Sequence, residues 1–453
     1  MRRALRVTAG LMLLTTPLAA QRSLTIYNDG RVLMRATLAE PVASGISSHR
    51  LALGFLDAAS LFSLDPDVMV TGVSYDAAVD ERNTLRRALG RKLVFETGGM
   101  RNGVRDTVVA EVLGVEPELF RLEDGSVTFQ RPGRPRYPAD LVLAAPTVSL
   151  NVRSTAAKDQ LRLAWFTEGA SWSAAYQAVL GRGSARVMGQ AEVQSARLSV
   201  QDAEIQLLAG NVGRAVAKDF ALQRARAEMA VAAEAPSAPA GEQQVGEAHL
   251  YTIPGRYTIT PGVSTVASLF EPGSAPWERV YTIRSQLPWY GPLPQYGEPT
   301  QVPVEIQYLF KRPPQSDFGR KPLPAGVWRL YEPDSAGRLQ LVGEASTTHS
   351  APGQDLRLTA GNAFDITAER IQVDYTTQRE TRRTIGLAGY RVTVNNAKDS
   401  AVTVDVLEER HGEWSVLESS VPGEKLSSTL TRFRVRVPAR GQAMVSYRLR
   451  VVW

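Results

Sequence analysis

The stretch that decides the fold is Leu161–Val212, which begins LRLAWFTEGASWSAAYQAVL and continues, after a short turn, with ARVMGQAEVQSARLSVQDAEIQLLAGNV. Apolar and polar side chains alternate on either side of a glycine turn, and this period of two is typical of strands that bury one face of a sheet. We therefore expect Trp165, Trp172 and Tyr176 at the packed centre of a β-sandwich.

Similar alternation extends outward from this stretch toward both ends of the chain. The Asn-Asp-Gly sequence at residues 28–30 separates two apolar runs and predicts a hairpin. Further strands are expected at Ile46–Phe55, Val68–Tyr75, Lys92–Thr97, Val108–Val112 and Ser126–Phe129. Helices are expected only at Asp57–Leu64, Asp80–Leu89 and Lys218–Ala233.

The chain is therefore predicted to be an all-β, multidomain protein built of β-sandwiches, with little helix. A proline-rich segment near residue 135 predicts a domain edge, and the evenly spaced strands after Gly389 favour an immunoglobulin-like unit at the C-terminus. The predicted limits are a signal peptide at 1–20, an N-terminal β domain at 21–145, a central β-sandwich at 146–385 with a flexible Ala-rich insertion at 214–249, and an immunoglobulin-like β domain at 386–453.

The first 20 residues have the order of a secretory signal peptide. Arg2, Arg3 and Arg6 precede a short apolar run, and small residues lead to Ala20. No later apolar stretch reaches the roughly 20 residues that a membrane-spanning helix needs. We expect an exported protein of the bacterial envelope, periplasmic or secreted, with no membrane span after cleavage of the signal.

Composition excludes several kinds of chemistry. The sequence has no Cys, so thiol nucleophiles, thiolate zinc sites and disulfides are excluded. The formal net charge of +6 includes the three arginines of the expected signal peptide and leaves +3 for the mature chain. Such a balance lacks the concentrated basic face of nucleic-acid-binding proteins, and no nucleic-acid partner is expected.

No sequence motif assigns catalytic, cofactor-binding or metal-ligating residues. The chain lacks the serine-elbow, phosphate-loop and paired-histidine zinc motifs. Strand alternation could align Glu409, His411 and Glu413 toward a cation, but so few ligands favour a charged turn instead. We expect no cofactor.

Two surfaces are candidates for binding. Trp289, Tyr290 and Tyr296 lie among prolines that prevent regular structure, and such a loop either displays its rings to a partner or buries them. Five arginines alternate with apolar residues in the last two predicted strands and would line one face, for anionic ligands or for protection of a sheet edge. These are Arg432, Arg434, Arg436, Arg448 and Arg450.

Carboxylates near aromatic side chains provide an alternative. Glu168 lies close in sequence to two tryptophans, and Asp202 and Glu204 are two residues apart, on one predicted strand face. Glycoside hydrolysis requires two carboxylates that flank a cleft. The ordinary interpretation is that the rings form core and the acids are solvated.

Five blocks in order resemble the mucoidy-inhibitor-A-like family of exported bacterial proteins, which carries a domain of unknown function. They are LAWFTEGASWSAAYQAVL, AEIQLLAGNV, PLPAGVWRLYE, LVGEASTTHSAPGQDLRLTAGNAFDI and GYRVTVNNAKDSAVTVDVLEE, and they span roughly the last two thirds of the chain. The resemblance implies an exported, β-rich protein and brings no established reaction or catalytic residues. Residues 24–145 lack the coiled coil of longer members.

These observations favour an exported, non-catalytic protein of the cell envelope, a scaffold or interaction module for an envelope protein or polysaccharide. The alternatives are an envelope hydrolase acting on glycan or peptide, and a carbohydrate-binding protein. Paired carboxylates within about 5 to 10 Å of one another in a groove would favour the hydrolase.

Overall fold

A computed structural model describes residues 21–101, 104–210, 242–245, 248–286 and 297–453. Strands make up 65% of the structure and helices 4%, which confirms the predicted all-β, multidomain fold. The expected signal peptide and the expected helix at Lys218–Ala233 lie outside the described residues. The expected helix at Asp57–Leu64 is only a 3-10 turn, η1 (Ala58–Ser60).

A seven-stranded sheet combines three strands from before residue 64 with four strands from after residue 160. In spatial order its strands are β16 (Glu242–Val245), β17 (Ala248–Ile259), β15 (Val200–Ala209), β1 (Gln21–Tyr27), β2 (Arg31–Leu38), β12 (Leu161–Glu168) and β4 (Phe62–Ser63). β1 and β2 form the predicted hairpin, and Gly30 supplies its positive φ of 89°. β1 also pairs in parallel with β15, so residues on both sides of position 145 share one sheet.

A small unit is inserted between two paired strands. β5 (Val68–Asp76) and β11 (Thr147–Ser154) pair in a three-stranded sheet with β3 (Gly45–Leu51), and the chain between them builds a separate sheet with its own core. That sheet contains β10 (Arg134–Arg136), β6 (Lys92–Arg101), β7 (Val104–Val115), β8 (Glu118–Leu122) and β9 (Val127–Thr128). The 3-10 turn η2 (Ala139–Leu141) precedes the return to β11.

Helix α1 (Glu81–Arg87) confirms the helix expected at Asp80–Leu89. Asp80 is the N-cap residue, and its carboxylate accepts a hydrogen bond from the amide of Asn83 at 2.8 Å. Acidic and basic residues lie in its first and last turns respectively, which suits the helix dipole.

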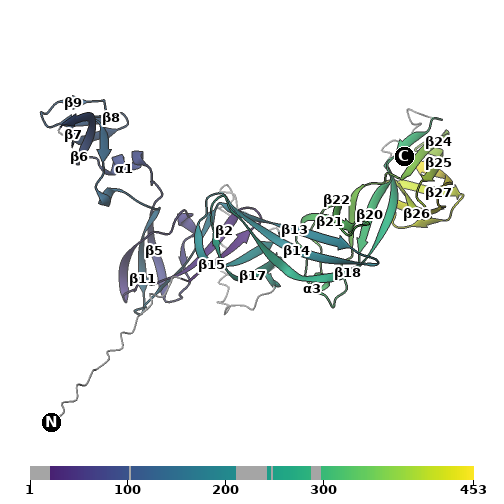
Figure 1. Ribbon diagram of the computed structural model, residues 1–453, viewed down its shortest axis with the longest axis horizontal. Coiled ribbons are helices and arrows are strands. Elements are labelled where there is room, and N and C mark those ends of the chain that lie inside the picture. The colour runs from purple at the N-terminus through teal and green to yellow at the C-terminus, as the bar shows by residue number, and fades with distance from the viewer. Residues whose placement is uncertain (1–20, 102–103, 211–241, 246–247, 287–296) are drawn as a thin grey trace, which may run out of the picture.

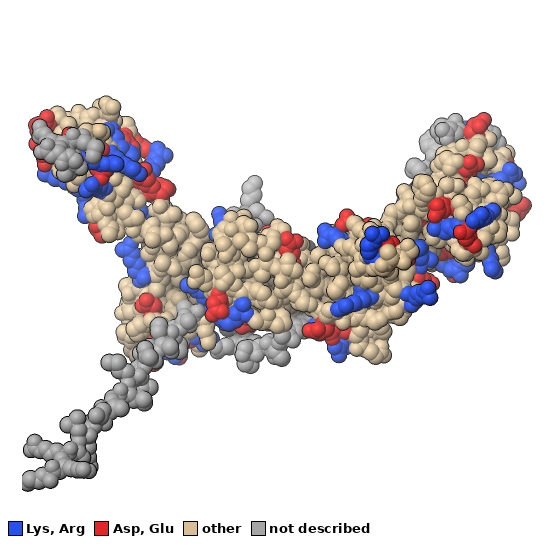
Figure 2. Space-filling view, in the orientation of Figure 1, with Lys and Arg blue, Asp and Glu red and all other residues tan. Residues whose placement is uncertain are grey.

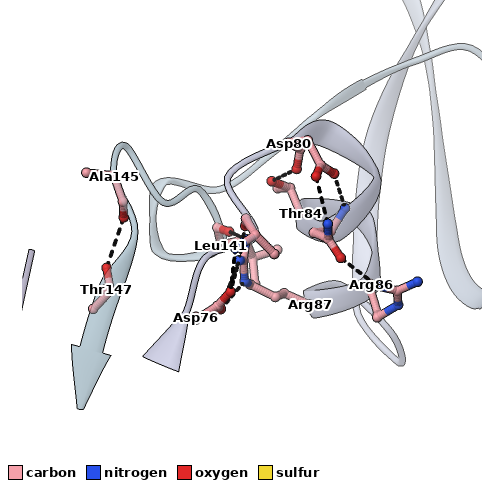
Figure 3. A network of polar contacts seen from close by, with 10 residues as sticks. Asp76, Asp80, Thr84, Arg86, Arg87, Leu141, Ala145 and Thr147 are labelled. Carbon is pink, nitrogen blue, oxygen red and sulfur yellow. Dashed lines mark hydrogen bonds and ion pairs between the residues drawn. The ribbon is translucent and has the colours of Figure 1, made fainter. Parts of the chain in front are cut away.

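Arg87 of α1 joins the two chain segments that connect the inserted unit to the rest of the molecule (Figure 3). Its guanidinium donates to both carboxylate oxygens of Asp76, at 2.9 and 3.0 Å, and to the carbonyl oxygens of Ala78 and Leu141. Asp76 ends β5, Ala78 belongs to the outgoing link and Leu141 to the returning one. Burial opposes ionisation of Asp76, but hydrogen bonds from Ala78 and Arg87 outweigh it and lower the pKa of this carboxyl.

We expect Arg87→Met to loosen the inserted unit relative to the body. The variant keeps the length of the side chain but removes the donors, and lost hydrogen bonds to a charged group are worth about 1 to 3 kcal/mol of local opening. Because the sequence has no Cys, a chain with both Glu123→Cys and Gln201→Cys carries spin labels at these two positions alone. The distribution of distances between the two labels should broaden in the Arg87→Met protein.

Arg86→Met is the matched control, since Arg86 bonds Asn83 and Glu116 within the inserted unit. Its distance distribution should equal that of the parent. An equally narrow distribution in the Arg87→Met protein would remove the role assigned to Arg87.

A ten-stranded sheet continues from the central body into the C-terminal end. Its path is β22 (Leu339–Thr347), β21 (Gly326–Pro333), β13 (Ala170–Leu180), β14 (Ser184–Ser195), β18 (Ser264–Gln286), β26 (Val402–Glu409), β29 (Leu430–Val437) and β28 (Gly423–Lys425), and β20 (Glu305–Phe310) joins β18 to β23 (Leu356–Asn362). The 23 residues of β18 pair first with β14 and then with β20 and β26. One strand thus belongs to both regions.

The C-terminal end is a sandwich of this sheet against a second one. The second sheet has the order β19 (Thr300–Val302), β24 (Ile366–Arg379), β25 (Thr384–Asn396), β30 (Gly441–Val452) and β27 (Glu413–Ser419). Buried side chains from both sheets form one core. Strands from before residue 386 contribute to it, and the immunoglobulin-like assignment stays a prediction.

The core of the central body confirms the expected packing of the opening stretch. Trp165, Trp172 and Tyr176 are all buried. Tyr176 stacks on Trp328 with ring centroids 4.6 Å apart, and its hydroxyl donates to the carbonyl oxygen of Pro324 at 2.8 Å. A short helix, α3 (Asp317–Arg320), adds a buried phenylalanine beside these rings.

The molecule is elongated (Figure 1). The inserted unit with β6–β9 lies at one end, the central strands β13, β14 and β18 run along the middle, and the sandwich with β24–β27 lies at the other end. The inserted unit and the C-terminal sandwich therefore lie far apart on the molecule.

Candidate functional site

An open hollow lies at the edge of the C-terminal sandwich. It has a volume of about 400 Å³. Its lining consists of Trp414, Ser415, Val416, Leu417, Glu418, Ser419, Gly423, Lys425 and Thr431. One wall is thus strand β27, and the opposite wall is β28 with the start of β29. We call this hollow the β27–β28 groove.

Both walls of the β27–β28 groove are edges of sheets. Within the described part of the chain, β27 pairs only with β30, and β28 pairs only with β29. The ring nitrogen of Trp414 donates to the carbonyl oxygen of Ser428 at 3.0 Å and so joins β27 to the loop between β28 and β29. Edge strands present unpaired main-chain donors and acceptors, so two such edges are offered to another chain on this side of the sandwich.

A buried ionic cluster lies directly behind the groove. Glu408 of β26 has no solvent exposure, and its carboxylate lies between the guanidinium groups of Arg370 and Arg410, at 3.0 and 2.6 Å. The hydroxyl of Tyr447 donates to the same carboxylate at 2.7 Å. Glu408 is the ladder neighbour of Thr431, a residue that lines the groove.

The cluster joins the two sheets of the sandwich. Glu408 belongs to the ten-stranded sheet, whereas Arg370 and Tyr447 belong to β24 and β30 of the opposite sheet. Burial lowers the pKa of Arg370, but the charge of Glu408, the neighbouring tyrosines and the hydrogen bond to Glu408 together outweigh it, and the net shift is upward. Burial is also the main reason that the pKa of Tyr447 is raised. The cluster therefore places a carboxylate between two guanidinium groups inside the sandwich and links its two sheets behind the groove.

Sequence reasoning missed this cluster, although a signal was present. In β26 the residues Val404 and Val406 point into the core, and the same parity places Glu408 and Arg410 inside. Charged residues at inward positions of a strand must be paired, because an isolated buried charge is very costly. The neighbouring Glu409, the possible cation ligand named with His411 and Glu413, has the opposite parity in β26 and is only partly buried.

The structure divides the five candidate arginines between two sheets. Three of them lie on β29 in the ten-stranded sheet and two on β30 in the opposite sheet, so they do not form one face. Their apolar neighbours point inward from both strands. Four of the arginines have carboxylate partners, in the pairs Arg432–Glu424, Arg434–Asp405, Arg448–Asp374 and Arg450–Glu413. Arg436 is exposed on the outer face of β29.

The candidate aromatic loop lies outside the described residues, so Trp289, Tyr290 and Tyr296 stay a prediction. The neighbouring described residue Gly297 donates its amide to the carbonyl oxygen of Gln372, at 3.3 Å.

The candidate hydrolase carboxylates are not brought together. From Glu204 the ladder runs through Ser23 and Arg35 to Ala164, three strands away, and Glu168 lies four residues further along β12. Three strand spacings alone amount to roughly 14 Å, more than paired catalytic carboxylates allow.

Asp202 and Glu204 of β15 both have side chains that are not buried, with the buried Ala203 between them. Asp202 has a φ of 47° at a register shift in the pairing with β17. Its carboxylate pairs with Arg256 at 3.0 Å, whereas Glu168 lies 3.8 Å from Arg197. These acids take part in surface ion pairs on separate strands.

The described ranges contain no group of three or more His, Cys, Asp or Glu side chains placed to hold a metal ion. Glu409 faces Arg284 at 3.8 Å and Glu413 faces Arg450 at 3.0 Å, so both acids considered with His411 have basic partners.

The face shown in Figure 2 carries its charges mainly on the end regions, with both signs intermixed. Much of the visible central surface is uncharged. This face thus offers no extended patch of one sign for an anionic polymer.

In the part of the chain that the structure describes, no helix has the length and apolar character needed to cross a membrane. No protein-family model matches the sequence, and no similar curated protein was found. The resemblance to the mucoidy-inhibitor-A-like family therefore stays a prediction.

Proposed function

We propose that the protein is an exported, non-catalytic interaction module of the cell envelope, and that the β27–β28 groove is its binding site. The observation that carries the proposal is the meeting of two sheet edges around one open hollow. Edges of this kind recruit other chains unless they are covered. The separation of Glu168 and Glu204 supports binding in preference to hydrolysis.

The proposal is tested with a photo-crosslinking amino acid placed at Leu417 in intact cells. Leu417 lines the groove and is 48% exposed. We expect a discrete covalent adduct at this position, identified by mass spectrometry of its protein or sugar component. Met444 is the matched control, because it is 54% exposed on β30 of the same sheet but does not line the groove.

Equal adduct patterns at Leu417 and Met444 would contradict the proposed site. Turnover of purified cell-wall material by the full chain, abolished by Glu168→Gln or Glu204→Gln, would replace the proposal with the hydrolase alternative.

A further inference from the structure

The β27–β28 groove follows the main chain of a single strand. Six consecutive residues of β27, from Trp414 to Ser419, line it. At about 3.3 Å per residue they extend for about 20 Å, the length of a typical strand. A hollow lined along one wall by six consecutive residues of a strand matches an extended polypeptide better than a compact ligand.

The main chain of β27 can accept another strand. β27 is the last strand of its five-stranded sheet among the described residues, with β30 on its inner side. A register shift between Val416 and Glu418 interrupts its own ladder and leaves Leu417 exposed. Peptides that add to such edges gain main-chain hydrogen bonds, and alternate side chains enter the adjoining hollow.

The side chains that line the groove define the chemistry of the occupant. Val416 and Trp414 are half-buried and pack against the sandwich core, so they offer apolar contact. Glu418 and Lys425 are exposed, and in the described ranges neither has an ion-pair partner. The groove therefore presents one carboxylate and one ammonium group that have no ion-pair partner in the described ranges, with an apolar surface between its walls.

We propose that an extended polypeptide segment of about six residues adds to β27 as a further strand of the five-stranded sheet. An aliphatic side chain of the segment contacts Val416, and an acidic side chain faces Lys425. This inference rests on the proposed function and names the class of its partner. A glycan, or a second copy of this chain, is the competing occupant.

The test begins with a phage-displayed library of random heptapeptides selected on the full chain. We expect enriched peptides with alternating aliphatic and acidic positions, and the best of them is synthesised for titration calorimetry. Lys425→Glu should weaken its binding at least tenfold. Arg436→Glu is the matched control, since it reverses another exposed charge in the same sandwich, and it should leave affinity unchanged.

A second peptide, methylated at alternate main-chain nitrogens, separates strand addition from side-chain contact. It keeps every side chain but loses the donors that a ladder needs, so its affinity should fall at least tenfold. Equal affinity of the two peptides would overturn the inference, and so would enrichment of the same peptides on the Lys425→Glu protein.

The failure of this inference is distinguishable from failure of the proposed function. An adduct at Leu417 that contains sugar, or one that joins two copies of this chain, would refute a separate polypeptide partner and leave the groove as a binding site. Absence of both the selective adduct and enriched peptides would refute both.

Discussion

Replacing Glu408 with Ala is expected to destabilise the C-terminal sandwich by about 3 to 5 kcal/mol. The substitution leaves two buried guanidinium groups, Arg370 and Arg410, without their carboxylate. Removing one member of a buried ion pair has this cost because the remaining charge is neither hydrated nor compensated. The Tyr447 hydroxyl also loses its acceptor.

The loss should be measured locally, because a chain of several units need not unfold in one step. Hydrogen exchange of the β26 and β24 amides in increasing urea reports the sandwich itself. Protection there should decrease strongly, while the amides of β6 and β7 in the inserted unit keep theirs. The groove should also lose its shape, since Thr431 pairs directly with Glu408.

Glu413→Ala is the control for this prediction. Glu413 also pairs with an arginine, Arg450, at 3.0 Å, but its side chain is 61% exposed. Exposed pairs contribute about 0 to 1 kcal/mol. If Glu408→Ala cost no more than Glu413→Ala, the cluster would not hold the two sheets together.

The features that sequence alone could predict are local ones. The Asn-Asp-Gly turn before β2, the capped helix α1 and the alternation in β12 and β13 each depend on neighbours within a few residues, and all are present. Inward parity likewise placed Trp165, Trp172 and Tyr176 in the core. Such signals identify which residues are buried, but not which strands lie side by side.

Strand order could not be predicted, because it is set by pairings between distant segments. β1 pairs in parallel with β15, about 180 residues later, and β18 serves two regions of the molecule. The arginines of β29 and β30 alternate as expected, yet the two strands enter opposite sheets. The candidate groove depends on that same order, since β27 and β28 form its walls only because each is the last strand of its sheet.

The folded protein is also expected to lose stability at high pH, because burial raises the pKa values of several tyrosines. Burial raises the pKa of Tyr176 and of Tyr447, and the pKa of Tyr137 is raised to about 12, chiefly by burial and by the charge of Glu81. A raised pKa in the folded state means that the unfolded chain, with a tyrosine pKa of about 10, releases its protons first. The free energy of unfolding therefore stays constant below pH 10 with respect to these groups and falls as the pH rises above it.

Each such tyrosine contributes a slope of up to about 1.4 kcal/mol per pH unit between the pKa of the unfolded chain and its own raised pKa. Because folded domains are only marginally stable, we expect Tyr176 and Tyr447 to cause cooperative unfolding as the pH rises above about 11. Absorbance of tyrosinate at 295 nm should rise together with the loss of far-ultraviolet circular dichroism.

The variant Tyr447→Phe checks the contribution of one phenol. Its free energy of unfolding should fall less steeply with pH, by the slope that a single tyrosine contributes. The variant is also less stable at neutral pH, because Glu408 loses a hydrogen-bond donor. A stability that stayed level from pH 10 to 12 in the parent chain would mean that these phenols are not buried in the folded protein.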